Sequence, residues 1–226
     1  MEADAVDRSG RAGPGGGSGA ITVRRGVPAG AEPRAAELYW EAFGRKLGPA
    51  LNPPEKAVPF IATHLDPDRA VCALLDGRLV GLAGYQLEGR SLTGGSAGAV
   101  LRAYGRVRGL PRLLLLALFE RRPAPGQLVM DGIAVDARMR GRGVGSLLLD
   151  EVAALAAEAG CREIRLDVID TNPRARALYE RRGFTAVRTE RTPYLRGLLG
   201  FGAVTTMRRI LGAGEAARGT RGTTEQ

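Results

Sequence analysis

The feature that most constrains the fold is a glycine-rich segment, RGRGVG, at residues 140–145. It follows an apolar run, Gln127–Val135, typical of a strand, and precedes residues 147–159, whose apolar side chains recur at helical spacing and end at Gly160. Glycines in a strand-to-helix turn let the backbone approach a ligand closely. The unpaired amides and dipole of the helix N-terminus then favour an anion. With Arg140 and Arg142 adding positive charge, the segment predicts a phosphate-binding turn.

Two common phosphate-binding classes can be compared with this turn. A nucleoside-triphosphate loop needs Lys followed by Ser or Thr after its last glycine, whereas this chain has Val144-Gly145-Ser146, which excludes that class. A dinucleotide-binding turn needs glycine at its first, third and sixth positions. Gly141 and Gly143 fit, and Ser146 does not. Because an acidic residue, Asp167 or Asp170, follows at a suitable distance, the dinucleotide alternative stays open.

Strand and helix patterns mix along the rest of the chain. We expect strands at residues 21–25, 70–75, 79–87, 127–135, 163–169, 184–188 and 203–210, and helices at residues 33–47, 53–65, 147–159 and 173–182. Asp76-Gly77 predicts a tight hairpin between two of the strands. The pattern favours an α/β fold with a mixed sheet.

Both ends of the chain differ in composition from the middle. Residues 1–20 and 212–226 contain few apolar side chains, which predicts disordered tails around one domain at residues 21–211. Residues 91–125 interrupt the α/β pattern. We expect a helical insertion there, with helix over residues 99–122 broken near Gly109-Leu110-Pro111.

The net charge of +9 comes almost entirely from arginine, since only two of the 33 basic residues are lysine. The arginines are scattered without interleaved aromatic residues, so we expect no nucleic-acid partner. A composition rich in arginine, alanine and glycine explains the charge without any ligand, and attraction to a phosphate-rich small molecule is the functional alternative. The two cysteines match no metal-ligand spacing. The longest apolar run, residues 113–119, is too short to span a bilayer, and the N-terminus carries no signal-peptide pattern. We therefore expect a cytoplasmic protein without a metal or a membrane partner.

Two motifs together resemble the GNAT superfamily of acyl-CoA-dependent N-acyltransferases. Arg140, Gly143 and Gly145 fit the pattern Arg/Gln-x-x-Gly-x-Gly/Ala, and about thirty residues later stands DTNPRARALYERRGF. The resemblance is clear over residues 127–187 and poor over residues 91–125. It implies a central mixed, mostly antiparallel sheet with helices on both faces. It also implies acetyl transfer from acetyl-CoA, as co-substrate, to a primary amine by direct attack in a ternary complex.

The resemblance also implies roles for individual residues. The turn that holds the CoA pyrophosphate would comprise Arg140, Gly141, Arg142, Gly143, Val144 and Gly145. The backbone of Ile133, Ala134 and Val135 would pair with the pantetheine amides, and Asn172 would contact the pantetheine arm. Tyr179 would donate a proton to the departing sulfur. Simpler roles stay open for two of them, since Asn172 also suits a helix N-cap and Tyr179 also suits the core.

The base is the least determined part of this hypothesis. An amine with a pKa of ~10.4 is protonated at neutral pH and must lose a proton before it attacks. Asp131, on the strand that enters the turn, is the first candidate; Asp167 and Asp170 compete with it, and His64 is expected at the surface near a helix end.

Nothing in the sequence identifies the acceptor, which we expect to be a small-molecule or peptide amine. The arginines of the insertion disfavour a polycationic acceptor through like-charge repulsion. The insertion would form a lid, a homodimer contact or an ordinary covering helix. Two other functions stay open: a non-catalytic acyl-CoA-binding module and a dinucleotide-binding oxidoreductase.

Overall fold

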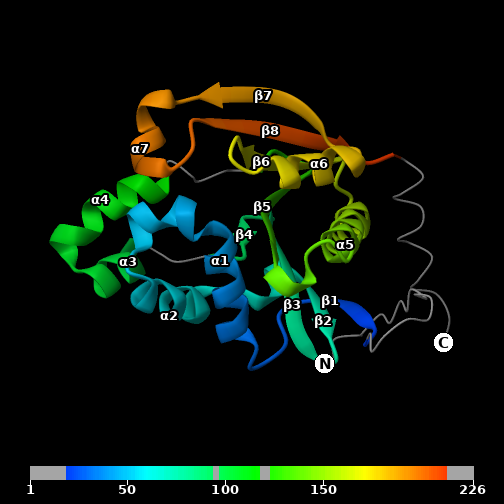
Figure 1. The fold of residues 1–226 in the computed structure, drawn as a ribbon, viewed down its shortest axis with the longest axis horizontal. Helices are drawn as coiled ribbons and strands as arrows, with labels where there is room; N and C mark the ends of the chain where they lie inside the picture. The colour runs from blue at the N-terminus through cyan, green and yellow to red at the C-terminus, as the bar shows by residue number, and fades with distance from the viewer. Residues whose placement is uncertain (1–18, 94–96, 118–122, 213–226) are drawn as a thin grey trace.

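The computed structural model describes residues 19–93, 97–117 and 123–212 (Figure 1). The strands are β1 (Ile21–Arg25), β2 (Ala70–Leu75), β3 (Arg78–Leu87), β4 (Arg90–Ser91), β5 (Gln127–Val135), β6 (Glu163–Ile169), β7 (Thr185–Arg191) and β8 (Ala203–Ile210). The helices are α1 (Glu32–Leu51), α2 (Pro54–His64), α3 (Ala97–Tyr104), α4 (Arg106–Ala117), α5 (Val144–Glu158), α6 (Pro173–Arg181) and α7 (Arg196–Leu199).

The eight strands of the described residues form one sheet in the order β1-β2-β3-β5-β6-β8-β7, with the short β4 paired to β3. Every pairing is antiparallel except β5 with β6, which is parallel. A parallel pair needs a long crossover, and α5 supplies it. The predicted mixed, mostly antiparallel sheet is confirmed.

The one parallel pairing is also the shortest contact between the long strands. Within the described residues, β5 and β6 pair only through residues 127–129 and 163–165, and the ladder ends at Val129 and Arg165. Beyond these residues the two strands have no mutual pairing, so the sheet opens between them. This opening lies beside the glycine-rich turn at the end of β5.

Helices cover both faces of the sheet, as Figure 1 shows, with α5 on one side and α1 to α4 on the other. The apolar side of α5 packs with α6 and the facing strand residues into one core, which includes Leu148, Leu166 and Tyr179. A second core joins α1, α2 and α3 to the opposite face around Leu38 and Leu82. The α5 helix comes close to β3 at Gly81, where an added Cβ would lie 2.8 Å from the Val144 side chain.

Most expected elements are found within a few residues of their predicted bounds. The Asp76-Gly77 hairpin is confirmed, with φ values of 50° and 77° that match the left-handed pair required by a type I′ turn. The helix predicted at residues 147–159 begins earlier, at Val144, because Gly143 in the left-handed conformation (φ 82°) already starts it. The last motif helix ends at Arg181, and β7 continues to Arg191.

The insertion is helical as expected, but the predicted position of its break was wrong. The break lies at Gly105, whose φ of +79° cannot continue a helix, whereas Pro111 lies inside α4. The sequence analysis missed β4 and α7, each of four residues or fewer. The predicted tails lie almost wholly outside the described residues, as do residues 94–96 and 118–122 of the insertion. Among the described helices, none is long and apolar enough to cross a membrane.

Candidate active site

The glycine-rich turn closes the end of β5 and starts α5. Asp136 begins a 3-10 turn by accepting a hydrogen bond from the Arg138 amide at 2.9 Å. The chain then reverses through Gly141 and Gly143, which have φ values of +78° and +82°. Side chains other than glycine rarely adopt these values, so the two glycines give the turn its shape.

The sequence analysis predicts an anion site at the backbone amides of this turn. Within the described residues, no backbone acceptor bonds the N–H groups of Gly141, Gly143, Val144 or Gly145, and no side chain caps the start of α5. Unpaired amides at a helix N-terminus, together with the helix dipole, favour a bound phosphate.

Arg140 and Arg142 are both exposed beside these amides. The Arg140 Nε also donates to the Val135 carbonyl oxygen at 3.2 Å, which ties the turn to the end of β5. The six turn residues that the sequence analysis singled out therefore lie together in the structure.

The opening in the sheet supplies the second part of the site. Residues 133–135 lie beyond the last β5–β6 pair, so the side of β5 that faces β6 has no strand partner there among the described residues. An extended ligand with amide groups can bind such an edge as an added strand. The turn and the free edge are consecutive in the chain, so one elongated ligand with a phosphate end can contact both.

Tyr179 lies in the core formed by α5 and α6, and its side chain is only 5% exposed. Its ring packs against Phe184 with centroids 5.9 Å apart. Burial raises the pKa of the phenol to about 12, so the hydroxyl keeps its proton at neutral pH. No hydrogen bond from this hydroxyl is formed within the described part of the chain, so the phenol is compatible with both the packing role and the acid role.

Asp131 lies in a β-bulge on the other face of the sheet. The register of β3 with β5 skips it, since Gly84 faces Gly132 and Tyr85 faces Met130. A Cβ on Gly84 would lie 3.1 Å from its Oδ2, on the side of the sheet covered by α1.

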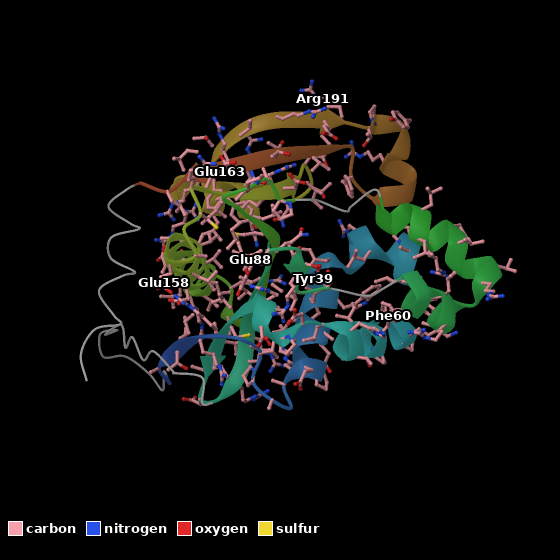
Figure 2. The ribbon with its side chains drawn as sticks, turned by 180° about the vertical axis from the view of Figure 1, so that it is seen from behind. Tyr39, Phe60, Glu88, Glu158, Glu163 and Arg191 are labelled. Carbon is pink, nitrogen blue, oxygen red and sulfur yellow. The ribbon has the colours of Figure 1, made fainter. Side chains whose placement is uncertain are left out.

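Two α1 aromatics lie against this bulge. A Cβ added to Gly132 would lie 2.5 Å from the Phe43 ring, so this ring fills the space beside the glycine. Phe43 also packs on Tyr39, with ring centroids 4.6 Å apart. Tyr39, labelled in Figure 2, lies where α1 meets the sheet. Burial raises the pKa of Tyr39, and the nearby negative charge of Asp131 raises it further. The sequence analysis did not place these two aromatic side chains beside Asp131, although a glycine inside a strand is a known signal of a bulge or a close backbone approach.

The other candidate residues have structural partners. Asn172 is the N-cap of α6, its Oδ1 accepting from the Ala175 amide at 3.2 Å, so the simpler interpretation is confirmed for that atom. Asp167 accepts a hydrogen bond from Thr206 at 2.7 Å, and Asp170 accepts from the Gly202 amide at 3.2 Å. His64 ends α2 and its Nδ1 lies 2.8 Å from the Phe60 carbonyl oxygen.

Comparison with known proteins tests the family that these features suggest. A family model described as the acetyltransferase (GNAT) family matches residues 33–184, about two-thirds of the chain. The chain belongs to the GNAT family. The match includes α1, the bulge, the glycine-rich turn and α6, so the family assignment covers both faces of the site. It supports an N-acetyltransferase and extends well upstream of the two motifs seen in the sequence.

Curated relatives match over a short segment. The chain is 39% identical over 56 residues to a thialysine N-epsilon-acetyltransferase from Bos taurus, which is 25% of this chain and 33% of that protein. A thialysine N-epsilon-acetyltransferase from Sus scrofa is 38% identical over the same length. The chain therefore spans about a third of the length of these relatives.

Solved structures share the fold over most of the chain. A GCN5-related N-acetyltransferase from Kribbella flavida has a TM-score of 0.57 and 21% identity, covering 84% of this chain and 98% of that chain. The ribosomal-protein-S18-alanine N-acetyltransferase from Escherichia coli has a TM-score of 0.53 and 17% identity, with 84% and 94% covered. At these identities the likeness establishes the fold.

Proposed function

We propose that the protein transfers the acetyl group of acetyl-CoA to a primary amine by direct attack in a ternary complex. The observation that carries this proposal is that two binding features, a turn with unpaired amides and an unpaired strand edge, adjoin each other in the chain. The unpaired amides of the turn follow directly on the β5 edge that β6 leaves unpaired. A pyrophosphate and a pantetheine arm, joined in that order, have the chemistry to fill both.

In this mechanism the turn binds the pyrophosphate through the amides of residues 140–145, and Ile133, Ala134 and Val135 bind the pantetheine amides through their backbone. The thioester then lies in the opening between β5 and β6. Asn172 contributes beside the pantetheine through its amide nitrogen, since its oxygen already caps α6.

The acceptor amine approaches from the face of Asp131, which removes its proton directly or through a water molecule. The amine nitrogen forms a bond to the carbonyl carbon, and a backbone amide of β5 stabilises the negative oxygen that develops. The carbon–sulfur bond then breaks and Tyr179 gives its proton to the sulfur. The new amide nitrogen loses its remaining excess proton, which restores the Tyr179 phenol through water. Burial keeps the phenol protonated at neutral pH, so the hydroxyl has a proton to donate when the thiolate forms.

Two alternatives make different predictions. A dinucleotide-binding oxidoreductase would be expected to have a doubly wound parallel sheet, whereas this sheet has one parallel pairing. A non-catalytic acyl-CoA-binding module would keep the turn and the open edge without turnover. Binding of a dinucleotide in place of acetyl-CoA would distinguish the first alternative from the proposal. Binding of acetyl-CoA without turnover would distinguish the second.

A thermal-shift comparison of acetyl-CoA with a nicotinamide dinucleotide tests the donor. At a concentration about 100 times its Kd, acetyl-CoA should raise Tm by about 5 °C or more, and the dinucleotide should leave Tm unchanged. Stabilisation by the dinucleotide alone would refute the proposal.

We also infer a cytoplasmic location. Cys72 and Cys161 are free and buried, as expected of thiols in a reducing compartment.

A further inference from the structure

The face of β5 and β6 that lies opposite α5 carries polar side chains up to the point where the strands separate. The alternate residues Ile164, Leu166 and Val168 face the α5 core, so Glu163, Arg165 and Asp167 face the other way. At the start of this row, Gln127 donates to Glu163 at 2.6 Å (Glu163 is labelled in Figure 2). Asp131 lies on this same face, on β5.

Within this row, the guanidinium of Arg165 lacks a full set of hydrogen-bond partners. Its Nε is buried and has no hydrogen-bond partner within the described residues. Its nearest acidic neighbour, Asp167, lies 4.0 Å from the guanidinium, at the outer limit of an ion pair, and accepts a hydrogen bond from Thr206 at 2.7 Å. A buried donor without a partner is unfavourable, which points to a function of this guanidinium beyond packing.

A ligand can nevertheless reach this guanidinium. The Arg165 side chain is 30% exposed, so its other nitrogens remain open to solvent. The planar fork of a guanidinium binds a carboxylate or a phosphate through two parallel hydrogen bonds, which a single ammonium group cannot do.

The position of Arg165 relates it to the reaction. It pairs with Val129, the last β5 residue in the parallel ladder, so it lies where the opening between the strands begins. Asp131 is two residues further along β5. Strands ~4.8 Å apart, with a rise of ~3.3 Å per residue, put the Cα atoms of Arg165 and Asp131 about 8 Å apart before the strands separate. One small molecule can therefore place an amine at Asp131 and an anionic group at Arg165.

We propose that Arg165 anchors an anionic group of the acceptor, so that the acceptor is a small amine that also carries a carboxylate or a phosphate. This inference rests on the proposed acetyltransferase function and deepens it by naming the acceptor class. Arg165 acts in it as a specificity-determining residue that binds the end of the acceptor away from the reacting nitrogen.

The test compares matched amines that differ in the anion. Each pair consists of an amino acid and its carboxamide, or an aminoalkyl phosphate and the corresponding amino alcohol, and free CoA release gives kcat and KM. The wild type is compared with Arg165→Met and Arg165→Lys. The control is Arg78→Met, which removes an exposed guanidinium at the start of β3.

The wild type should prefer the anionic member of at least one pair, and the type of pair distinguishes a carboxylate acceptor from a phosphate acceptor. Arg165→Met should raise KM for that anionic amine by about 10- to 100-fold, the loss expected for a charge-assisted hydrogen bond. It should change KM for the neutral member by less than about twofold and leave acetyl-CoA binding unchanged. Arg165→Lys should recover part of the affinity, and Arg78→Met should behave as the wild type.

Comparing each variant with the wild type on the same amine cancels the intrinsic reactivity of that amine, and melting curves show whether each variant is folded. A wild type that acetylates only neutral or cationic amines would overturn this inference and leave the acetyltransferase function intact. Equal losses for both members of a pair in Arg165→Met would assign Arg165 a structural role. Absence of turnover with every amine would instead refute the proposed function itself.

Discussion

The two side chains proposed to move protons lie on opposite faces of the sheet. Tyr179 belongs to the core under α5 and α6, whereas Asp131 lies on the face covered by α1. A thioester placed in the opening between β5 and β6 is accessible from both faces. This arrangement lets proton removal from the amine and proton delivery to the sulfur occur through different residues, without a single group having to serve both steps.

Replacing Tyr179 with Phe tests the acid role. The variant keeps the ring that packs on Phe184 and loses only the hydroxyl, so kcat should fall by about 100-fold or more. The Kd of acetyl-CoA, measured by titration calorimetry, should change by less than about twofold. An unchanged kcat would limit Tyr179 to a packing role.

Tyr179 should also contribute to the pH dependence of stability. Its folded-state pKa is raised to about 12 by burial, whereas a phenol in the unfolded chain has the ordinary value of 10.0. The neutral phenol therefore stabilises the folded state fully below pH 10, and this contribution is lost as the pH rises towards 12. Urea unfolding from pH 9 upwards should show the wild type losing about 2 kcal/mol more than Tyr179→Phe. Parallel pH curves for the two proteins would contradict the assigned burial.

At the scale of elements, the turn before α5 was predictable from its residues, because glycines with positive φ have a local cause. The opening between β5 and β6 was not predictable. It depends on a register between strands that are 36 residues apart, at residues 127 and 163, and on a bulge at Asp131 that only the pairing with β3 reveals. Local sequence likewise misplaced the break between α3 and α4, since Gly105 ends a helix whereas Pro111 is tolerated inside one.

Two glycines that flank α5 provide a matched test of the phosphate site. Gly143 starts the helix and Gly160 follows its end; both have positive φ, at 82° and 70°, and an added Cβ would meet nothing within 4 Å at either. Changing either to Ala should cost about 1–2 kcal/mol of stability through backbone strain. Gly143→Ala should in addition raise the Kd of acetyl-CoA by about tenfold, because the amides around it move. Equal acetyl-CoA affinities for the two variants would show that the turn does not bind the ligand.

At the scale of the molecule, three paired residues on each strand join the sheet half β1-β2-β3-β5 to the half β6-β8-β7. The α5 helix lies across this junction and shares one core with strands of both halves. Its solvent side is also held to β1, where Arg25 Nε donates to Glu151 at 2.8 Å and its terminal nitrogens bind Glu158. We therefore expect α5 to hold the two halves of the sheet together. The single domain predicted for residues 21–211 depends on the same packing.

Leu148→Ala tests that dependence. Leu148 is fully buried against β3, so its truncation should lower the free energy of unfolding by about 2–5 kcal/mol. Unfolding should remain one transition, with Trp40 fluorescence on α1 and far-UV circular dichroism changing together. Two separated transitions would show that the halves are independent units.

The central claim is tested most directly by incubating the wild-type chain with acetyl-CoA and a panel of primary amines, while free CoA release and the mass of each amine are followed. Amine-dependent CoA release, with matching formation of the N-acetylated amine, is the predicted result. Acetyl-CoA that binds and stabilises the protein without acetylation of any amine would contradict the proposed acetyl transfer and leave an acyl-CoA-binding module in its place.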